Sequence, residues 1–459
     1  MSKSNKTQAI LSGKAYPVLI TFALPIICGN IFQQLYNVVD AIVVGRYIGD
    51  LPLAGVSAAS PIMDVLYGII VGGTVGVGTL LSQLNGAGNH TRLRKVHETM
   101  LLGGSLFILA LSVISLLSAR WILQVQDTKP AVIEESMKYL TLIFLGLILN
   151  YLYNYFASAL RSCGDSRTPF IVLLASSVLH AGLDLLFGWV FRWGIRGVAV
   201  STVSCQLLSA VFLFVYIQKK FPLLAVGRKP RIERSEIRPI AAFAFAGALQ
   251  QIVVQLGRLL IQGMLSEMPL TGLNFTGENA KTNMVTGYNM GMRVENFLIS
   301  ITSGISAAGS VCIAQNFGNR NIPRVRRFFL LTMMTSLIYA CFIFALCSLF
   351  PVQLIGIFSR NAQVLEAGAL YTGTMAAIYF LPCFNEILQS FFRGLGRLKT
   401  CAFFSAFQVV IRVVLSALLI PHYGIKGICY AVGIGWLLMA LFEGPFALYT
   451  YRHLEQSKG

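Results

Sequence analysis

The chain has 459 residues, of which 56% are hydrophobic and only 12% are charged. This composition excludes an ordinary soluble globular protein and a disordered chain. The formal net charge is +18, with 36 Lys and Arg residues against 18 Asp and Glu residues. The charges lie mainly between long apolar runs, so they indicate membrane topology and argue against nucleic-acid binding.

Twelve apolar runs follow one another along the chain, and each is long enough to cross the hydrocarbon core of a bilayer. They cover residues 17–47, 52–83, 97–119, 135–160, 168–191, 195–218, 239–265, 284–314, 328–350, 363–392, 400–421 and 425–450. In lipid, every backbone polar group must find a partner within its own span. We therefore expect an all-α polytopic membrane protein with twelve transmembrane helices.

The first run contains two residues that are unusual in a spanning helix. Pro25 interrupts the hydrogen bonding of the helix, and Asp40 places a carboxyl group within apolar sequence. A charge at that depth costs about 2.5–3.5 kcal/mol on insertion scales and usually marks an ion or proton site. The alternative is that Asp40 lies near an interface and its carboxylate reaches the headgroups.

The second half of the sequence repeats the first. One constant shift, which we call the repeat offset, pairs Gly86 with Gly318 and Arg161 with Arg393, without gaps, over a long segment. Each copy holds six spans, so both copies enter the membrane in the same sense. We predict an N-terminal six-helix bundle (residues 1–220), a basic cytoplasmic linker (221–238) and a C-terminal six-helix bundle (239–459). The two bundles would be related by a parallel repeat.

The N-terminus, alternate loops and the C-terminal tail carry most of the Lys and Arg residues. By the positive-inside rule, both termini should be cytoplasmic. We expect a multi-pass protein of the cell (inner) membrane that is monomeric and is surrounded by membrane lipids. The nine cysteines are scattered, with no spacing suited to zinc, so we expect no metal and no other cofactor.

Three segments carry a resemblance to a known family: QLNGAGN at 83–89, QNFGN at 315–319, and Arg161-x-x-Gly164-Asp165-x-x-Thr168-Pro169. With the opening run and the frame of six plus six spans, they resemble the multidrug and toxic compound extrusion (MATE) family, in its DinF-like branch. The resemblance covers essentially the whole chain.

The resemblance implies a cation pocket in the N-terminal bundle, formed by Asp40, His180, Asp184 and Thr202. The residues support this grouping, because His180 and Asp184 are four apart and share one face of a helix. The family usually has Asn at position 180. A histidine titrates near physiological pH, and its nitrogen is a poor ligand for a hard ion, so protons are favoured over sodium. His180 as a packing residue is the alternative.

Other polar residues within the spans are candidates for further roles. Glu386 is a possible second coupling site. Arg258, Arg293 and Arg412 are expected to pair with Glu295, Glu386 or backbone carbonyls rather than with substrate. A drug-sized cavity needs aromatic and apolar walls with a few polar groups. The candidates for its lining are Gln33, Gln34, Tyr36, Asn37, Asn150, Tyr153, Asn154, Gln251, Gln255, Met290, Met292 and Tyr379.

These features predict a secondary active antiporter that exports amphipathic, often cationic organic compounds in exchange for protons or sodium. Alternating access between the two bundles would move the small-molecule substrate. The alternative is a flippase for lipid-linked or polymer intermediates, which a cationic cavity would favour. A membrane enzyme is a third class, but the sequence has no triad, metal-ligand or nucleotide-binding motif.

Overall fold

The computed structural model describes residues 4–43, 49–227, 229–264, 275 and 279–455; the side chains of 4, 5, 36–43 and 189 lie outside the description. The described residues are almost entirely helical and contain no β-strand. The helices of the first half are α1 (Ser4–Ser12), α2 (Ala15–Val43), α3 (Asp50–Gly86), α4 (His90–Val125), α5 (Pro130–Leu145), α6 (Leu147–Ser162), α7 (Arg167–Asp184) and α8 (Ile195–Lys220). Those of the second half are α9 (Arg234–Met264), α10 (Ala280–Gly318), α11 (Ile322–Leu349), α12 (Pro351–Gly356), α13 (Ala362–Met375), α14 (Phe380–Gly394), α15 (Leu398–Tyr423) and α16 (Ile425–Arg452).

Every predicted span falls on one of these helices or on a broken pair. Within the described residues, ten helices are long and apolar enough to cross a membrane. An eleventh span is the pair α13 and α14, which is bent by 56°. The twelfth is the pair α5 and α6, which meet at Gly146. The twelve-helix architecture expected from the sequence is therefore confirmed.

The repeat offset also relates the helix boundaries of the first half to those of the second half. Gly86 ends α3, and its repeat mate Gly318 ends α10. Pro130 and Ala362, which are related by the same repeat offset, begin the broken pairs α5–α6 and α13–α14. The α9 helix begins at Arg234, inside the segment predicted as linker, and continues through Pro239, its sixth residue. The division into domains stays a prediction.

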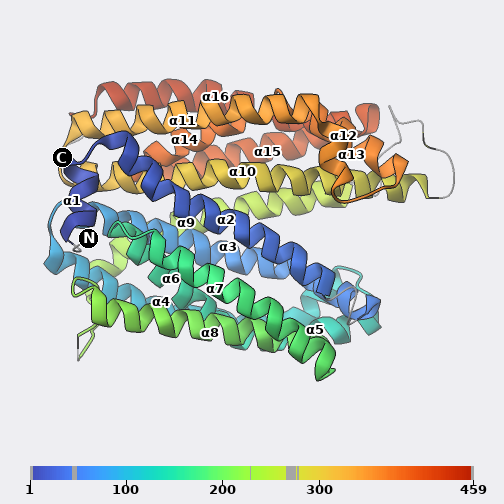
Figure 1. Cartoon of the computed structure of the whole chain (residues 1–459), viewed down its shortest axis with the longest axis horizontal. Coiled ribbons are helices and arrows are strands. Elements are labelled where there is room, and N and C mark those ends of the chain that lie inside the picture. Colours follow the sequence, from blue (N-terminus) through green and yellow to red (C-terminus); the bar gives the residue numbers. More distant parts are fainter. Residues whose placement is uncertain (1–3, 44–48, 228, 265–274, 276–278, 456–459) are drawn as a thin grey trace.

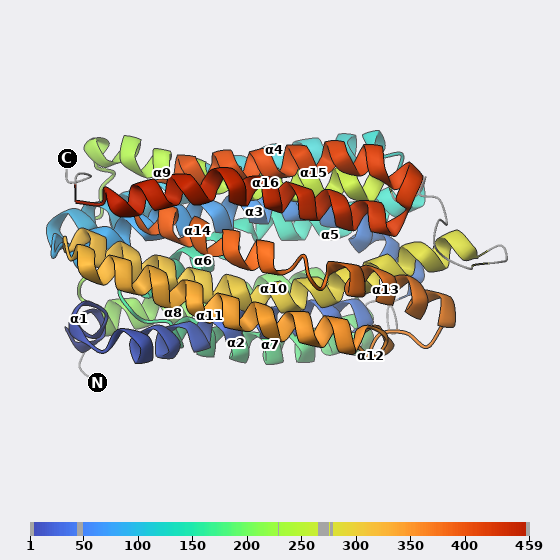
Figure 2. The same cartoon turned by 90° about the horizontal axis from the view of Figure 1, so that it is seen from above.

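The two halves form two bundles that lie side by side along their length (Figures 1 and 2). The first spanning helix of each half packs against both bundles: α2 contacts α7 and α10, and α9 contacts α15 and α3. Both chain ends lie at one end of the molecule, which we call the terminal end (Figure 1). The opposite end, where α5 and α12 lie, is called the distal end.

Glycines let the helices cross closely at the seams between the halves. A Cβ atom on Gly72 would lie 2.2 Å from the backbone oxygen of Gly247, and one on Gly76 would lie 2.2 Å from that of Phe243. The repeat mate of Gly72 is Gly304, where a Cβ would lie 2.6 Å from Ile27. Such close packing of small residues is how helices associate in lipid, where the hydrophobic effect gives no net attraction.

Candidate functional site

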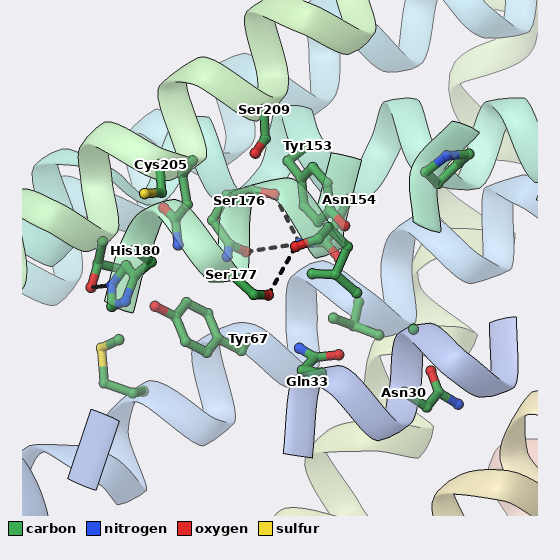
Figure 3. Close-up of a pocket in the computed structure, with 18 of the residues that line it drawn as sticks. Asn30, Gln33, Tyr67, Tyr153, Asn154, Ser176, Ser177, His180, Cys205 and Ser209 are labelled. Atoms are coloured by element: carbon green, nitrogen blue, oxygen red, sulfur yellow. Dashed lines mark hydrogen bonds between the residues drawn. The ribbon is translucent and has the colours of Figure 1, made fainter. Parts of the chain in front are cut away.

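A polar cavity of about 670 Å³ lies within the N-terminal half of the molecule. Helices α2, α3, α5, α6, α7 and α8 supply its lining, and α10 adds Arg293. Figure 3 shows Tyr153 and Asn154 of α6 near Ser176, Ser177 and His180 of α7, with Tyr67 of α3 extending towards them. A volume of this size is within the range for drug-sized ligands.

His180 lines this cavity and forms a buried pair with Asp184. The two side chains are 3% and 1% exposed, and His180 Nδ1 lies 2.8 Å from Asp184 Oδ2. They meet because residues four apart lie on one face of α7. Directly after Asp184 the helix widens into a π-helical segment, Leu185–Val190. Such segments are rare and are often found at functional sites.

The neighbouring helix α8 completes the cluster with two hydroxyl groups. Thr202 Oγ1 lies 2.9 Å from His180 Nε2, and Ser201 donates a hydrogen bond to Asp184 Oδ1. Close approach of α8 depends on Gly197, because a Cβ there would lie 2.8 Å from the backbone of Phe187. Three of the four predicted cation-pocket residues therefore lie together. Asp40 is in α2, but its side chain is outside the description, and the role of the group stays a prediction.

The predicted cavity-lining residues are divided by the structure. Gln33, Asn150, Tyr153 and Asn154 line the cavity. Gln251 and Gln255 instead pack near Gly68 at the seam between α3 and α9. Gln34 is half-buried in α2, away from the described lining. Tyr36 and Asn37 have side chains outside the description.

The remaining candidates lie in the core of the C-terminal bundle. Met290 and Met292 pack against its hydrophobic cluster, and Tyr379 belongs to that cluster. Tyr379 and Tyr371 both donate hydrogen bonds to Glu295 Oε2, at 3.3 and 2.6 Å. Composition cannot separate an aromatic that lines a cavity from one that fills a core, since both are apolar with one polar tip.

Glu386 lies in the C-terminal bundle, where Arg393 Nη2 is 3.4 Å and Ser306 Oγ is 2.9 Å from its Oε1. Among the described residues, no ion pair contains Arg258, Arg293 or Arg412, but Arg412 interacts electrostatically with Glu295, so their pairing stays a prediction. Both acids also have other partners. Glu295 accepts hydrogen bonds from two tyrosines, and Glu386 accepts one from Arg393.

Several cavity residues were not anticipated from the sequence. Ser201 was missed although it precedes Thr202, and Tyr67, Asp64 and Arg161 also lie at the site. Arg161 was recognised only as part of a motif. Comparison with its repeat mate could have identified Arg161: Glu386 lies about two turns before Arg393 on the same helix, whereas the equivalent residue before Arg161 is Asn154.

The two halves are joined at the terminal end by two equivalent hydrogen bonds. Gln83 Nε2 donates to the oxygen of Gly394 at 3.0 Å, and Gln315 Nε2 donates to the oxygen of Ser162 at 2.7 Å. The repeat offset relates the two donors to each other and the two acceptors to each other. We call these two bonds the glutamine clasp.

Glycines and helix α1 reinforce the clasp. A Cβ on Gly86 would lie 1.9 Å from the oxygen of Gln315, so the helices touch backbone to backbone. Helix α1 contacts both halves: Lys6 Nζ lies 3.0 Å from Asp165 Oδ2, and Arg324 Nη2 donates to the oxygen of Gly13, just after α1, at 2.6 Å. The clasp and helix α1 therefore hold the two halves together at the terminal end.

A duplicated helical bundle with a drug-sized polar cavity and spans long enough to cross a bilayer defines a polytopic membrane transporter. The MatE family model matches residues 25–186 and 259–418, one match in each half and together more than half of the chain. The protein therefore belongs to the MatE family.

Relatives agree with this assignment over nearly the full length. The chain is 24% identical to the probable multidrug resistance protein YpnP of Bacillus subtilis (strain 168), covering 98% of this chain and 97% of the relative. It is 26% identical to a FAD transporter of Shewanella oneidensis, covering 94% of each. A solved outward-facing multidrug resistance MATE family transporter is 18% identical and has the same fold, with a TM-score of 0.90 over 98% of this chain and 99% of that one.

Proposed function

We propose that the protein is a secondary active antiporter that exports amphipathic organic compounds in exchange for protons. The observation that carries this proposal is that His180 lines the cavity and forms a buried ion pair with Asp184. A cation bound there lies beside any substrate in the cavity, so the two can affect each other's affinity. Such coupling is reciprocal, as an exchanger requires.

The hydrogen bonds around His180 support the uptake and release of one proton. In the charged form, the imidazolium forms an ion pair with Asp184, whose Oδ2 lies 2.8 Å from Nδ1; Nε2–H donates to Thr202, and the Thr202 hydroxyl donates to the oxygen of Val198, 3.0 Å away. In the neutral form with the proton on Nδ1, the Thr202 hydroxyl turns to donate to Nε2. Rotation of one hydroxyl therefore accompanies the change in charge.

The ligand types favour protons over sodium as the coupling ion. Hard cations are held by several oxygen atoms. Asp184, Ser201 and Thr202 offer oxygens here, but the imidazole of His180 lies between the oxygens of Asp184 and Thr202.

The arrangement of the two halves is consistent with alternating access. In this state the glutamine clasp joins the halves at the terminal end. Movement of substrate to or from that end requires the clasp to open. We propose that the terminal end is cytoplasmic, that the protein resides in the cell membrane, and that it acts as a monomer. The names of the relatives, multidrug resistance and FAD transport, support organic molecules as substrates.

The test is transport in proteoliposomes that contain the purified protein. Efflux of an organic dye is measured under an imposed proton gradient or an imposed sodium gradient, each without the other. We expect the proton gradient alone to drive efflux, and His180→Ala to abolish it. Arg120→Gln is the matched control, because Arg120 pairs with Glu134 at the exposed surface, far along α4 from the cavity. Efflux that sodium alone drives would contradict proton coupling, and no gradient-driven efflux would contradict antiport.

A further inference from the structure

The cavity is lined by an arginine that has no ion-pair partner among the described residues. Arg161, near the end of α6, lines the cavity and is half-buried. Within the part of the chain that the structure describes, no ion pair or hydrogen bond joins it to another residue. Among the described residues, the phenol of Tyr153 is its electrostatic neighbour, and this phenol carries no charge in its ordinary protonated form.

The repeat explains how Arg161 comes to be unpaired. Its mate in the second half, Arg393, lies 3.4 Å from Glu386 on the same helix. The residue that corresponds to Glu386 in the first half, by the same repeat offset, is Asn154. Asn154 donates to the backbone oxygen of Asn150 at 2.9 Å, so its amide interacts within α6. The first half has therefore kept the arginine and has an amide in place of the acid.

Two nearby acids, Asp165 and Asp184, have other partners, and no described ion pair joins Asp64 to Arg161. Asp165 lies 3.0 Å from Lys6 and accepts a hydrogen bond from the hydroxyl of Thr168 at 2.9 Å. Asp184 is paired with His180. Asp64 also lines the cavity, and the cation that acts on it is Arg258 of α9. Arg293 adds a second guanidinium to the lining, again without an ion pair among the described residues.

An arginine inside a membrane bundle is costly unless something neutralises it. A guanidinium also matches the planar or tetrahedral oxygens of carboxylates, sulfonates and phosphates better than an ammonium does. Tyr67, Tyr153 and Phe170 give the same cavity aromatic surface for a ring system. The cavity thus offers an anion-binding group and flat apolar contacts together.

We propose that this cavity binds amphipathic organic anions, with an aromatic body against the tyrosines and an acidic group at Arg161. This inference rests on the proposed transport function and names the substrate class of the same cavity. The acidic group belongs either to a soluble compound or to a lipid headgroup. Both would meet Arg161 by the same chemistry, so the experiment compares them.

The test uses two dyes with the same xanthene ring and opposite charge, fluorescein as the anion and rhodamine 123 as the cation. Binding of each to the full chain in phosphatidylcholine nanodiscs is followed by fluorescence anisotropy. We expect fluorescein to bind more tightly than rhodamine 123. Arg161→Gln should weaken fluorescein binding at least tenfold and leave rhodamine 123 binding unchanged or tighter, whereas Arg161→Lys should keep part of the fluorescein affinity.

A second variant keeps the arginine and supplies the missing acid. Asn154→Glu recreates the pairing of Glu386 with Arg393, so an internal carboxylate should compete with fluorescein for Arg161 and weaken its binding at least tenfold. Arg120→Gln, outside the cavity, should change neither affinity. Nanodiscs that contain phosphatidylglycerol test whether the bound anion is a lipid headgroup or a soluble compound. If phosphatidylglycerol weakens fluorescein binding and this effect requires Arg161, the anion is a lipid headgroup. If phosphatidylglycerol has no such effect, the anion is a soluble compound.

Two results would overturn the inference. One is that fluorescein affinity is unchanged in both Arg161→Gln and Asn154→Glu, although the midpoint temperature of thermal unfolding shows that each variant is folded. The other is tighter binding of rhodamine 123 than of fluorescein by the unmodified protein. Neither result touches the antiport proposal, which depends on gradient-driven efflux and not on the charge of the dye. Loss of gradient-driven efflux, in turn, leaves the affinity comparison intact.

Discussion

Gly86→Val should open the terminal end of the molecule. The new Cβ would lie 1.9 Å from the oxygen of Gln315, whereas real Cβ contacts are essentially never under 3.0 Å, so the helices must separate by at least the difference of about 1.1 Å. The atoms that would meet the new Cβ belong to the backbone of Gln315, so no side-chain rotation can relieve the clash. Added volume in a packed contact costs about 1–3 kcal/mol.

The separation also breaks the glutamine clasp, since its bonds of 3.0 and 2.7 Å would lengthen beyond hydrogen-bonding distance. Each hydrogen bond contributes about 0.5–1.5 kcal/mol net. A combined destabilisation of at least about 2 kcal/mol shifts the balance between closed and open terminal ends by about 30-fold. The expected result is a large population in which the two halves have moved apart at this end.

The assay is a distance measurement between spin labels on His90→Cys and Asn319→Cys, two exposed positions at the terminal end of different halves. Cys28 and Cys341 are replaced by serine, because the other described cysteines are buried. The unmodified protein should show mainly the shorter distance, and Gly86→Val should add a longer one. Gly103→Val is the matched control, because a Cβ on Gly103 meets nothing within 4 Å.

Gly86→Val could fail to fold, so a second variant tests the same reasoning without a clash. Gln83→Leu combined with Gln315→Leu removes both bonds of the clasp and keeps similar side-chain volume. It should populate the longer distance to a smaller extent. If a folded Gly86→Val and the double variant both give the distance distribution of the unmodified protein, the terminal-end contacts do not hold the halves together and the reasoning is refuted.

Three further predictions concern coupling and topology. Asp40→Asn and Asp184→Asn should each abolish proton-driven efflux, and near-normal efflux by either variant would contradict this. The double variant should be no worse than either single variant, because groups that act as one unit give non-additive losses. In the same vesicles, dye efflux by His180→Asn should no longer respond to protons and should be stimulated by sodium, because an amide oxygen can ligate sodium. Efflux that still responds to protons would count against His180 as the coupling group. Reporter fusions should read cytoplasmic at residue 229 and extracellular at residue 278, and the reverse pattern would contradict the proposed orientation.

The spans and the repeat could be predicted because they depend on local sequence. Apolar runs fix which segments enter the membrane, and polar residues at the helix ends mark where each span stops. The offset that pairs Gly86 with Gly318 therefore reappears in the helix boundaries. The contact between His180 and Asp184 was predictable for the same reason, because one turn of helix brings them together.

The breaks within the spans were not predicted. The bend of 56° between α13 and α14 lies at residues 376–379, and Pro382 just after it cannot donate to the carbonyl of Ile378, so the sequence does contain a cause for this break. The π-helical segment after Asp184 has no proline within it. That segment depends on how neighbouring helices pack, and a single segment carries little information about its neighbours.

The lining of the cavity depends on how each helix is rotated about its axis. Tyr153 faces the cavity, whereas Tyr379 is fully buried in the other bundle, although both are tyrosines in broken spans. Sequence alone gives the amphipathic character of such residues but not the direction in which they point. Arg161 shows that comparison of the two halves can recover part of this information, because a missing partner is visible as a difference between repeat mates.

The glutamine clasp has the form of a contact in a symmetric homodimer. Each half gives the same donor and the same acceptor to the other, as two identical chains do across a two-fold axis. In a homodimer, any substitution is made in both subunits at once, so an acid cannot be lost from one copy alone. Joining the copies in one polypeptide removes that constraint: the clasp stays symmetric, while Asn154 and Glu386 can differ and the two bundles can acquire different chemistry.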